Sequence, residues 1–203
     1  MSTLPLSPTR VLADHFVGHA SLVRDIVLVA GGACSVGLLA QVSIPMWPVP
    51  ITGSTLGVML VGAMLGARRG AASLTTYAVG GLAGIPWFSD AAGGMAALAK
   101  PSFGFILAFI PTAFLIGWLS ERRWDRRPAT SLAAFAAASL LPFLIGVPWM
   151  WANLQILTGK TLGLWETLDA GFIRFIPGGI VKWLLASAIL LGAWKVVGER
   201  SES

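Results

Sequence analysis

The sequence predicts an all-α integral membrane protein with six transmembrane helices and both termini in the cytoplasm. Of its 203 residues, 56% are hydrophobic and only 11% are charged, and the mean hydropathy is +0.78. A soluble domain carries about 25% charged residues. Because one transmembrane helix needs about 20 mostly apolar residues, a chain of this length suits about six spans with short connections.

Six apolar segments follow one another along the chain, separated by prolines, glycines and charged clusters. We place them at residues 25–42, 54–66, 71–84, 102–120, 131–151 and 176–197. Pro142 and Pro148 are expected to kink the fifth segment, because proline removes a helical hydrogen bond. The expected organisation is a membrane domain at residues 25–197, a solvated cytoplasmic arm at 1–24 and a cytoplasmic tail at 198–203.

The basic residues orient these segments. With the amino terminus inside, the outer loops carry only Lys100, Lys160 and Arg174. The inner segments carry Arg10, Arg24, Arg68, Arg69, Arg122, Arg123, Arg126, Arg127, Lys195 and Arg200. Cytoplasmic segments of membrane proteins are enriched in Lys and Arg, so the pattern favours two cytoplasmic termini. The net charge of +5 is then loop charge beside a lipid bilayer, and no nucleic-acid surface is expected.

The apolar run at residues 172–190 has Arg174 at its entry, and Lys182 is the one charge further inside it. A lysine at the centre of a membrane helix costs roughly 2.5–3.5 kcal/mol on insertion scales, so we interpret Lys182 as a ligand-binding residue. The alternative is a lysine near the helix end that snorkels to the interface. The orientation places it near the outer face, with a proline-rich loop at 43–52 that suits a cap and a glycine-rich folded loop at 85–100.

Small residues recur along the first segment at intervals of three or four residues. They are Ala30, Ala33, Cys34 and Gly37. Small residues at this spacing let another helix approach closely. Two interpretations stay open: packing within the same bundle, and docking of a separate membrane subunit.

Motifs for catalysis, metal binding or nucleotide binding are not found. The TGKT sequence at 158–161 has Leu154 where a phosphate-binding loop needs glycine. One cysteine and two histidines make no metal site, and neither a metal nor a cofactor is expected. A multipass membrane enzyme would need paired acids, whereas the aspartates are scattered, so we predict a protein that is not an enzyme. A ligand-free scaffold is the other alternative.

Four blocks of sequence carry a family resemblance. They are PVPITGSTLG at 48–57, GAMLGARRGAAS at 62–73, GGLAGIPWFSDAAGG at 80–94 and FIPGGIVKWLLA at 175–186. They resemble the biotin-specific S components (BioY family) of energy-coupling-factor transporters. The resemblance implies an S-component-like six-helix bundle in the cell (inner) membrane. It also implies a vitamin pocket near the outer face, and docking through the first helix onto a transmembrane coupling subunit driven by cytoplasmic ATPases.

The resemblance also implies site residues. Lys182 matches the family's ligand-site lysine, Gly93 and Gly94 match the loop that lines the pocket, and Thr52 matches the junction of the cap with the second helix. The family's usual acid and glutamine are replaced here by Gly179 and Ser54. We therefore expect Lys182 to meet a ligand carboxylate or a ring carbonyl, with Asp90 as a further polar contact. The expected ligand is biotin, and the alternative is a biotin-like or lipoate-like carboxylated ring.

Overall fold

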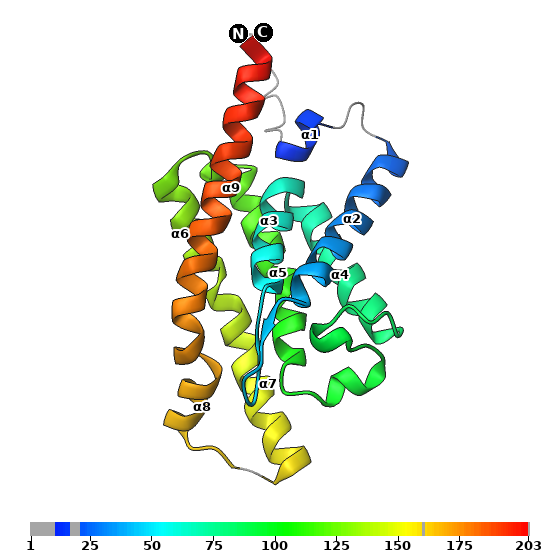
Figure 1. Ribbon diagram of the computed structural model, residues 1–203, viewed down its shortest axis with the longest axis vertical. Helices are drawn as coiled ribbons and strands as arrows, with labels where there is room; N and C mark the ends of the chain where they lie inside the picture. Colours follow the sequence, from blue (N-terminus) through cyan, green and yellow to red (C-terminus); the bar gives the residue numbers. More distant parts are fainter. Residues whose placement is uncertain (1–10, 17–20, 160, 203) are drawn as a thin grey trace, which may run out of the picture.

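The computed structural model describes residues 11–16, 21–159 and 161–202, and it is a helical bundle with one short β-hairpin (Figure 1). The α-helices are α1 (Leu12–Phe16), α2 (Leu22–Ala40), α3 (Ser54–Leu65), α4 (Ala67–Leu82), α5 (Phe103–Ser120), α6 (Pro128–Ala138), α7 (Leu140–Thr158), α8 (Leu164–Gly171) and α9 (Ile176–Glu202). The hairpin pairs β1 (Ser43–Ile44) with β2 (Ile51–Thr52). Short 3₁₀ turns are η1 (Ser89–Ala91), η2 (Met95–Ala99), η3 (Trp124–Arg126) and η4 (Ile173–Phe175).

The prediction of a mostly helical membrane protein is confirmed at this coarse level. Within the described residues, four segments are long and apolar enough to cross a membrane: Leu22–Ala40, Phe103–Ser120, Pro128–Leu157 and Leu164–Val197. Helices α3 and α4 have 12 and 16 residues, which is shorter than a full span. The count of six spans, the orientation and the domain boundaries stay predictions.

The fifth predicted segment is two helices. Helix α6 ends at Ala138 and α7 begins at Leu140. Pro142 explains this break, because proline lacks the N–H that would bond the carbonyl of Ala138 and its ring crowds that carbonyl. Pro148, the other expected kink, lies inside α7. Helix α7 also runs to Thr158, beyond the predicted end of the fifth segment at residue 151, and α8 lies between α7 and α9.

Helix α5 lies at the centre of the bundle and packs against α3, α4 and α7. Its small residues allow this close packing. A Cβ atom at Gly117 would lie 2.3 Å from the backbone carbon of Gly66 and from the backbone nitrogen of Ala67. The turn that joins α3 to α4 therefore rests directly on the backbone of α5.

The arm before the first span is anchored, which corrects the expectation that it is solvated. Val11, Leu12 and Ala13 are buried. The Asp14 carboxylate accepts hydrogen bonds from Arg24, at 2.5 Å, and from Arg69, at 2.9 Å. Residues 1–10 and 17–20 of the predicted arm lie outside the described residues. Helix α1 is thus tied to both α2 and α4, near the C-terminal end of α9 (Figure 1).

Replacing Asp14 with asparagine is expected to loosen this anchor at neutral pH. Burial raises the pKa of Asp14, but the hydrogen bond and charge of Arg69 and the charge of Arg24 outweigh it, so the pKa lies below its usual value. The stabilisation is therefore present above the unfolded-state pKa of about 4 and is lost as the pH falls through the folded-state pKa. Thermal unfolding across pH is the measurement.

The difference in melting temperature between wild type and Asp14→Asn is expected to be largest at neutral pH and to vanish in acid. Asp169→Asn is the control, because Asp169 pairs with Arg174 in an exposed ion pair and such pairs contribute little. A difference that stays constant from pH 7 to acid would contradict the role given to Asp14.

Candidate ligand-binding site

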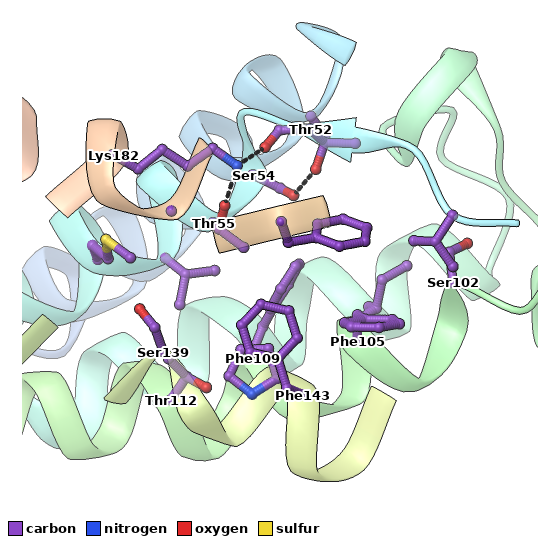
Figure 2. Close-up of a pocket in the computed structure, with 18 of the residues that line it drawn as sticks. Thr52, Ser54, Thr55, Ser102, Phe105, Phe109, Thr112, Ser139, Phe143 and Lys182 are labelled. Carbon is purple, nitrogen blue, oxygen red and sulfur yellow. Dashed lines mark hydrogen bonds between the residues drawn. The ribbon is translucent and has the colours of Figure 1, made fainter. Parts of the chain in front are cut away.

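A cavity of about 270 Å³ lies between α3, α5, α7, α9 and the hairpin (Figure 2). Its volume is near the lower end of the roughly 300–1,000 Å³ typical of small-molecule sites. Aromatic side chains dominate its wall: Tyr77, Phe105, Phe109, Phe143, Phe172, Phe175 and Trp183. Hydroxyl groups supply most of its polar atoms: Thr52, Ser54, Thr55, Ser89, Ser102, Thr112 and Ser139.

The proline-rich loop forms one wall of this cavity. Ser43 pairs with Thr52 and Ile44 with Ile51 in an antiparallel hairpin, so the chain folds back on itself within a few residues. Val49 and Pro50, near the tip, line the cavity, and Val49 is buried. The sequence-based expectation that this loop lies over a pocket agrees with this placement.

Lys182 points its ammonium group toward the start of α3 and does not snorkel along α9 (Figure 2). Its Nζ donates hydrogen bonds to the Thr52 carbonyl oxygen, at 2.6 Å, and to Thr55 Oγ1, at 2.7 Å. Both acceptors are neutral. Lys182 also lines the cavity, so the ammonium is held by the protein and borders the space that a ligand would occupy.

The other predicted site residues on the cavity wall surround this ammonium. Thr52 Oγ1 and Ser54 Oγ share a hydrogen bond of 2.5 Å, and Ser54 is buried. Gly179 lies on α9 one turn before Lys182. A Cβ atom there would approach nothing closer than the ring of Trp183, at 3.8 Å, so the position has room for a side chain. Thr52, Ser54, Gly179 and Lys182 are thus brought together at one site.

Asp90, Gly93 and Gly94 are outside the cavity lining, and their loop contributes Ser89 instead. Asp90 accepts a hydrogen bond from Ser43, at 3.3 Å, and does not partner Lys182. The backbone explains why glycine occupies both positions. A Cβ at Gly93 would lie 2.6 Å from the Ile85 carbonyl oxygen, and Gly94 has a φ of +86°. Glycine relieves both constraints, so this geometry gives no support for ligand contact by these three residues.

Sequence reasoning missed Thr55 and the aromatic wall. Thr55 stands in the first turn of α3, three residues after Thr52, and this short spacing was the available signal. Phe105 and Phe109 are four residues apart on α5, a spacing that places them on one face of the helix. Ser139 carried no signal: it lies at the break between α6 and α7 and accepts a 2.7 Å hydrogen bond from Trp183 Nε1 on α9.

The four small residues predicted for docking divide between two faces of α2. Ala33 is fully buried, and a Cβ at Gly37 would lie 2.8 Å from the Cβ of Trp87. These two pack within the bundle. Ala30 and Cys34 are exposed on the opposite face, where another membrane helix has access.

Replacing Thr55 with valine is expected to destabilise the ligand-free protein. The substitution keeps the shape of the side chain and removes the hydroxyl that accepts from Lys182, leaving a half-buried ammonium with one protein acceptor fewer. Losing such a partner costs about 1–3 kcal/mol. The measurement is thermal unfolding in detergent. Thr55→Ser, which keeps the hydroxyl, is expected to unfold like wild type, and equal melting of all three proteins would contradict the role of Thr55.

A helical membrane protein with a mostly apolar cavity, a few placed hydroxyl groups and one lysine has the features of a small-molecule binding site. Residues 9–199 match the family model described as BioY family. The chain therefore belongs to the BioY family, and the resemblance read from its sequence is confirmed.

Individual relatives agree with this assignment. The chain is 35% identical over 180 residues to "Biotin transporter BioY" of Rhizobium etli, with 86% of this chain and 94% of the relative covered. It is 30% identical to "Biotin transporter BioY" of Thermotoga maritima, with coverage of 79% and 90%. The crystal structure of the S-component for biotin from an ECF-type ABC transporter matches with a TM-score of 0.73 at 24% identity, covering 87% of this chain and 95% of that one. The fold is therefore that of an S component.

Proposed function

We propose that this chain is the membrane-embedded substrate-binding subunit of a biotin uptake system. The observation that carries the proposal is the cavity beside Lys182, in a chain whose relatives over most of its length are named biotin transporters. Such a site needs a mostly apolar wall and a few placed polar groups, and the wall described above has this composition. The function is transport and not catalysis.

We also propose six crossings with both termini in the cytoplasm of the cell (inner) membrane. Helix α1 and the C-terminal end of α9 lie at the same end of the molecule, as an even number of crossings requires (Figure 1). Helix α3 has 12 residues and rises about 18 Å, so it needs the hairpin to complete its crossing. Irregular backbone is tolerated at membrane depth where it lines a cavity, and this hairpin does so.

Energy is proposed to come from partner proteins. The sequence has no phosphate-binding loop of its own, and Lys160 of the TGKT segment lies outside the described residues. A transmembrane coupling subunit, driven by cytoplasmic ATPases, would dock on the exposed small residues of α2. Ala30 and Cys34 are four residues apart on that face, which allows close approach of a second helix.

Ligand binding is tested with the purified full-length chain in lipid nanodiscs. Thermal unfolding with biotin, lipoate and thiamine is measured, because a ligand that binds only the folded state raises the melting temperature with concentration. Biotin is expected to stabilise the protein and thiamine to have no effect. Stabilisation by lipoate alone would replace biotin with a lipoate-like ring, and no stabilisation by any of the three would contradict the proposal.

Leucine at positions 30 and 34 is expected to reduce co-purification of the coupling subunit and its ATPases while biotin binding persists. The larger side chains would keep the partner helix from the surface of α2, and neither residue borders the cavity. Ala133→Leu is the control, since Ala133 is an exposed small residue on α6. Unchanged recovery of the partners in the double variant would argue for docking elsewhere.

A further inference from the structure

The turn that joins α5 to α6 carries a group of arginines whose neighbouring acids point into the protein. Residues 121–127 read ERRWDRR. Glu121 Oε1 accepts a hydrogen bond from the N–H of Ala67 at the start of α4, at 2.8 Å. Asp125 is buried and accepts a 2.7 Å hydrogen bond from Trp194 Nε1 on α9. Both carboxylates are therefore held by other helices and are turned away from the surface of the turn.

The arginines on that surface lack acidic partners. Arg122, Arg123 and Arg127 are exposed, and within the described parts of the chain no aspartate or glutamate forms an ion pair with any of them. The pKa of Arg126 is lowered, first by burial and then by the charge of Arg123, against the opposing charge of Asp125. Positive charges thus repel one another in this turn, and an anion bound over it would relieve the repulsion.

An exposed apolar stripe on α5 leads to these arginines. Leu107, Phe114 and Trp118 are exposed, and their spacing of seven and four residues places them on one face of the helix. Arg122 continues the stripe four residues further on. Its guanidinium lies 3.5 Å from the centroid of the Trp118 ring, and its Nη1 donates a 2.9 Å hydrogen bond to the Trp118 carbonyl oxygen. Apolar surface and positive charge therefore meet at the end of α5.

A phospholipid with an anionic headgroup matches both halves of this surface. Its acyl chain would lie along the stripe, and tryptophan is enriched at the depth where headgroups begin. A guanidinium has five N–H donors in a planar fork that suits phosphate, and the carbonyl of Trp118 takes one of those of Arg122. A free phosphate or an acidic protein segment would use the arginines and leave the apolar stripe without a role.

We propose, building on the membrane placement proposed above and not on biotin binding, that the turn between α5 and α6 binds one anionic phospholipid. The headgroup phosphate lies at Arg122 and Arg123, and an acyl chain lies along Phe114 and Trp118. The hydrogen bond between Asp125 and Trp194 ties this turn to α9. A lipid bound here therefore also restrains the helix that carries Lys182.

Native mass spectrometry of the full-length chain in a neutral detergent measures the affinity of the first bound lipid. The probes are phosphatidylglycerol, which is anionic, and phosphatidylcholine, which has the same phosphate and acyl chains but a compensating positive charge. We expect wild type to bind phosphatidylglycerol at least roughly tenfold more tightly, because two arginines lie beside its net negative headgroup. Equal affinity for the two lipids would overturn the inference. Competition by glycerol 3-phosphate would also overturn it, because the site would then take a free phosphate.

Replacing both Arg122 and Arg123 with glutamine is expected to abolish this preference. Both side chains are exposed, so the double variant should melt like wild type in lipid-free detergent. The matched control replaces Lys100 and Arg174, two exposed residues of other loops, with glutamine and is expected to keep the preference. A preference that persists in the first variant, or disappears in both, would overturn the inference. Should the double variant fail to fold, Arg123→Gln alone is expected to reduce the preference about fivefold, and no reduction would overturn the inference.

Two further measurements separate the lipid site from the proposed transport function. Neither Arg122 nor Arg123 borders the cavity, so biotin is expected to stabilise the double variant as it stabilises wild type. Failure of biotin to stabilise wild type would contradict biotin binding and would not alter the lipid preference. If the double variant lost the coupling subunit and its ATPases but kept its preference for phosphatidylglycerol, the arginines would serve a protein partner, and the inference would be overturned.

Discussion

Lys182→Ala is expected to lower biotin affinity by roughly 100-fold or more. The substitution removes the charged group of the cavity and leaves the Thr52 carbonyl oxygen and the Thr55 hydroxyl without their donor. Truncating one partner of a buried, charged hydrogen-bonded pair typically costs about 2–5 kcal/mol. Equilibrium binding of radiolabelled biotin to protein in nanodiscs measures the change.

Lys195→Ala is the matched control for this experiment. Lys195 lies on the same helix, is exposed, and does not border the cavity. Its replacement is expected to leave biotin affinity unchanged. If Lys182→Ala bound biotin as tightly as wild type while remaining folded, the cavity described here would not be the binding site.

Gly117→Ala is expected to have the largest effect on stability. The added methyl group would lie 2.3 Å from backbone atoms of Gly66 and Ala67, and backbone in a packed turn cannot yield as a flexible side chain can. Overpacking of a core typically costs about 1–3 kcal/mol and sometimes more. We expect the apparent melting temperature in detergent to fall by roughly 5 °C or more, by the usual scaling for chains of this size.

Gly192→Ala provides the comparison, because it is also a helical glycine but a Cβ there meets nothing within 4 Å. Alanine in a helix interior is favoured over glycine by about 1 kcal/mol, so this variant is expected to be as stable as wild type or slightly more. Equal melting of the two variants would show that α5 does not rest on the α3–α4 turn as described.

Composition and charge predict a helical membrane protein, and Lys182 is singled out because it is a charged residue inside an apolar segment. The partners of that lysine were beyond prediction, because Thr55 is 127 residues away in the chain and only folding brings the two together. The same holds for Asp14, whose partner Arg69 is 55 residues away. Residues 11–13, in an arm that looks polar in sequence, are buried.

The glycine-rich loop shows a different limit. Glycine suits both a surface that meets a ligand and a turn with positive φ or a close backbone approach, and the sequence cannot separate these uses. Gly93 and Gly94 belong to the second kind here. Pro142 predicts a kink in the fifth segment. The break between α6 and α7 lies four residues before that proline, because the carbonyl of Ala138 lacks the N–H donor that proline does not have.

One of the two acceptors that hold Lys182 is a main-chain carbonyl, that of residue 52. Every amino acid has this group, so no substitution at position 52 deletes it so long as the backbone keeps its path. This half of the anchoring of the lysine is therefore independent of the side chain at position 52, whereas the other half requires a hydroxyl at position 55. Substitutions at positions 54 and 179 would in this way change the wall of the cavity while the main-chain acceptor of the lysine persists.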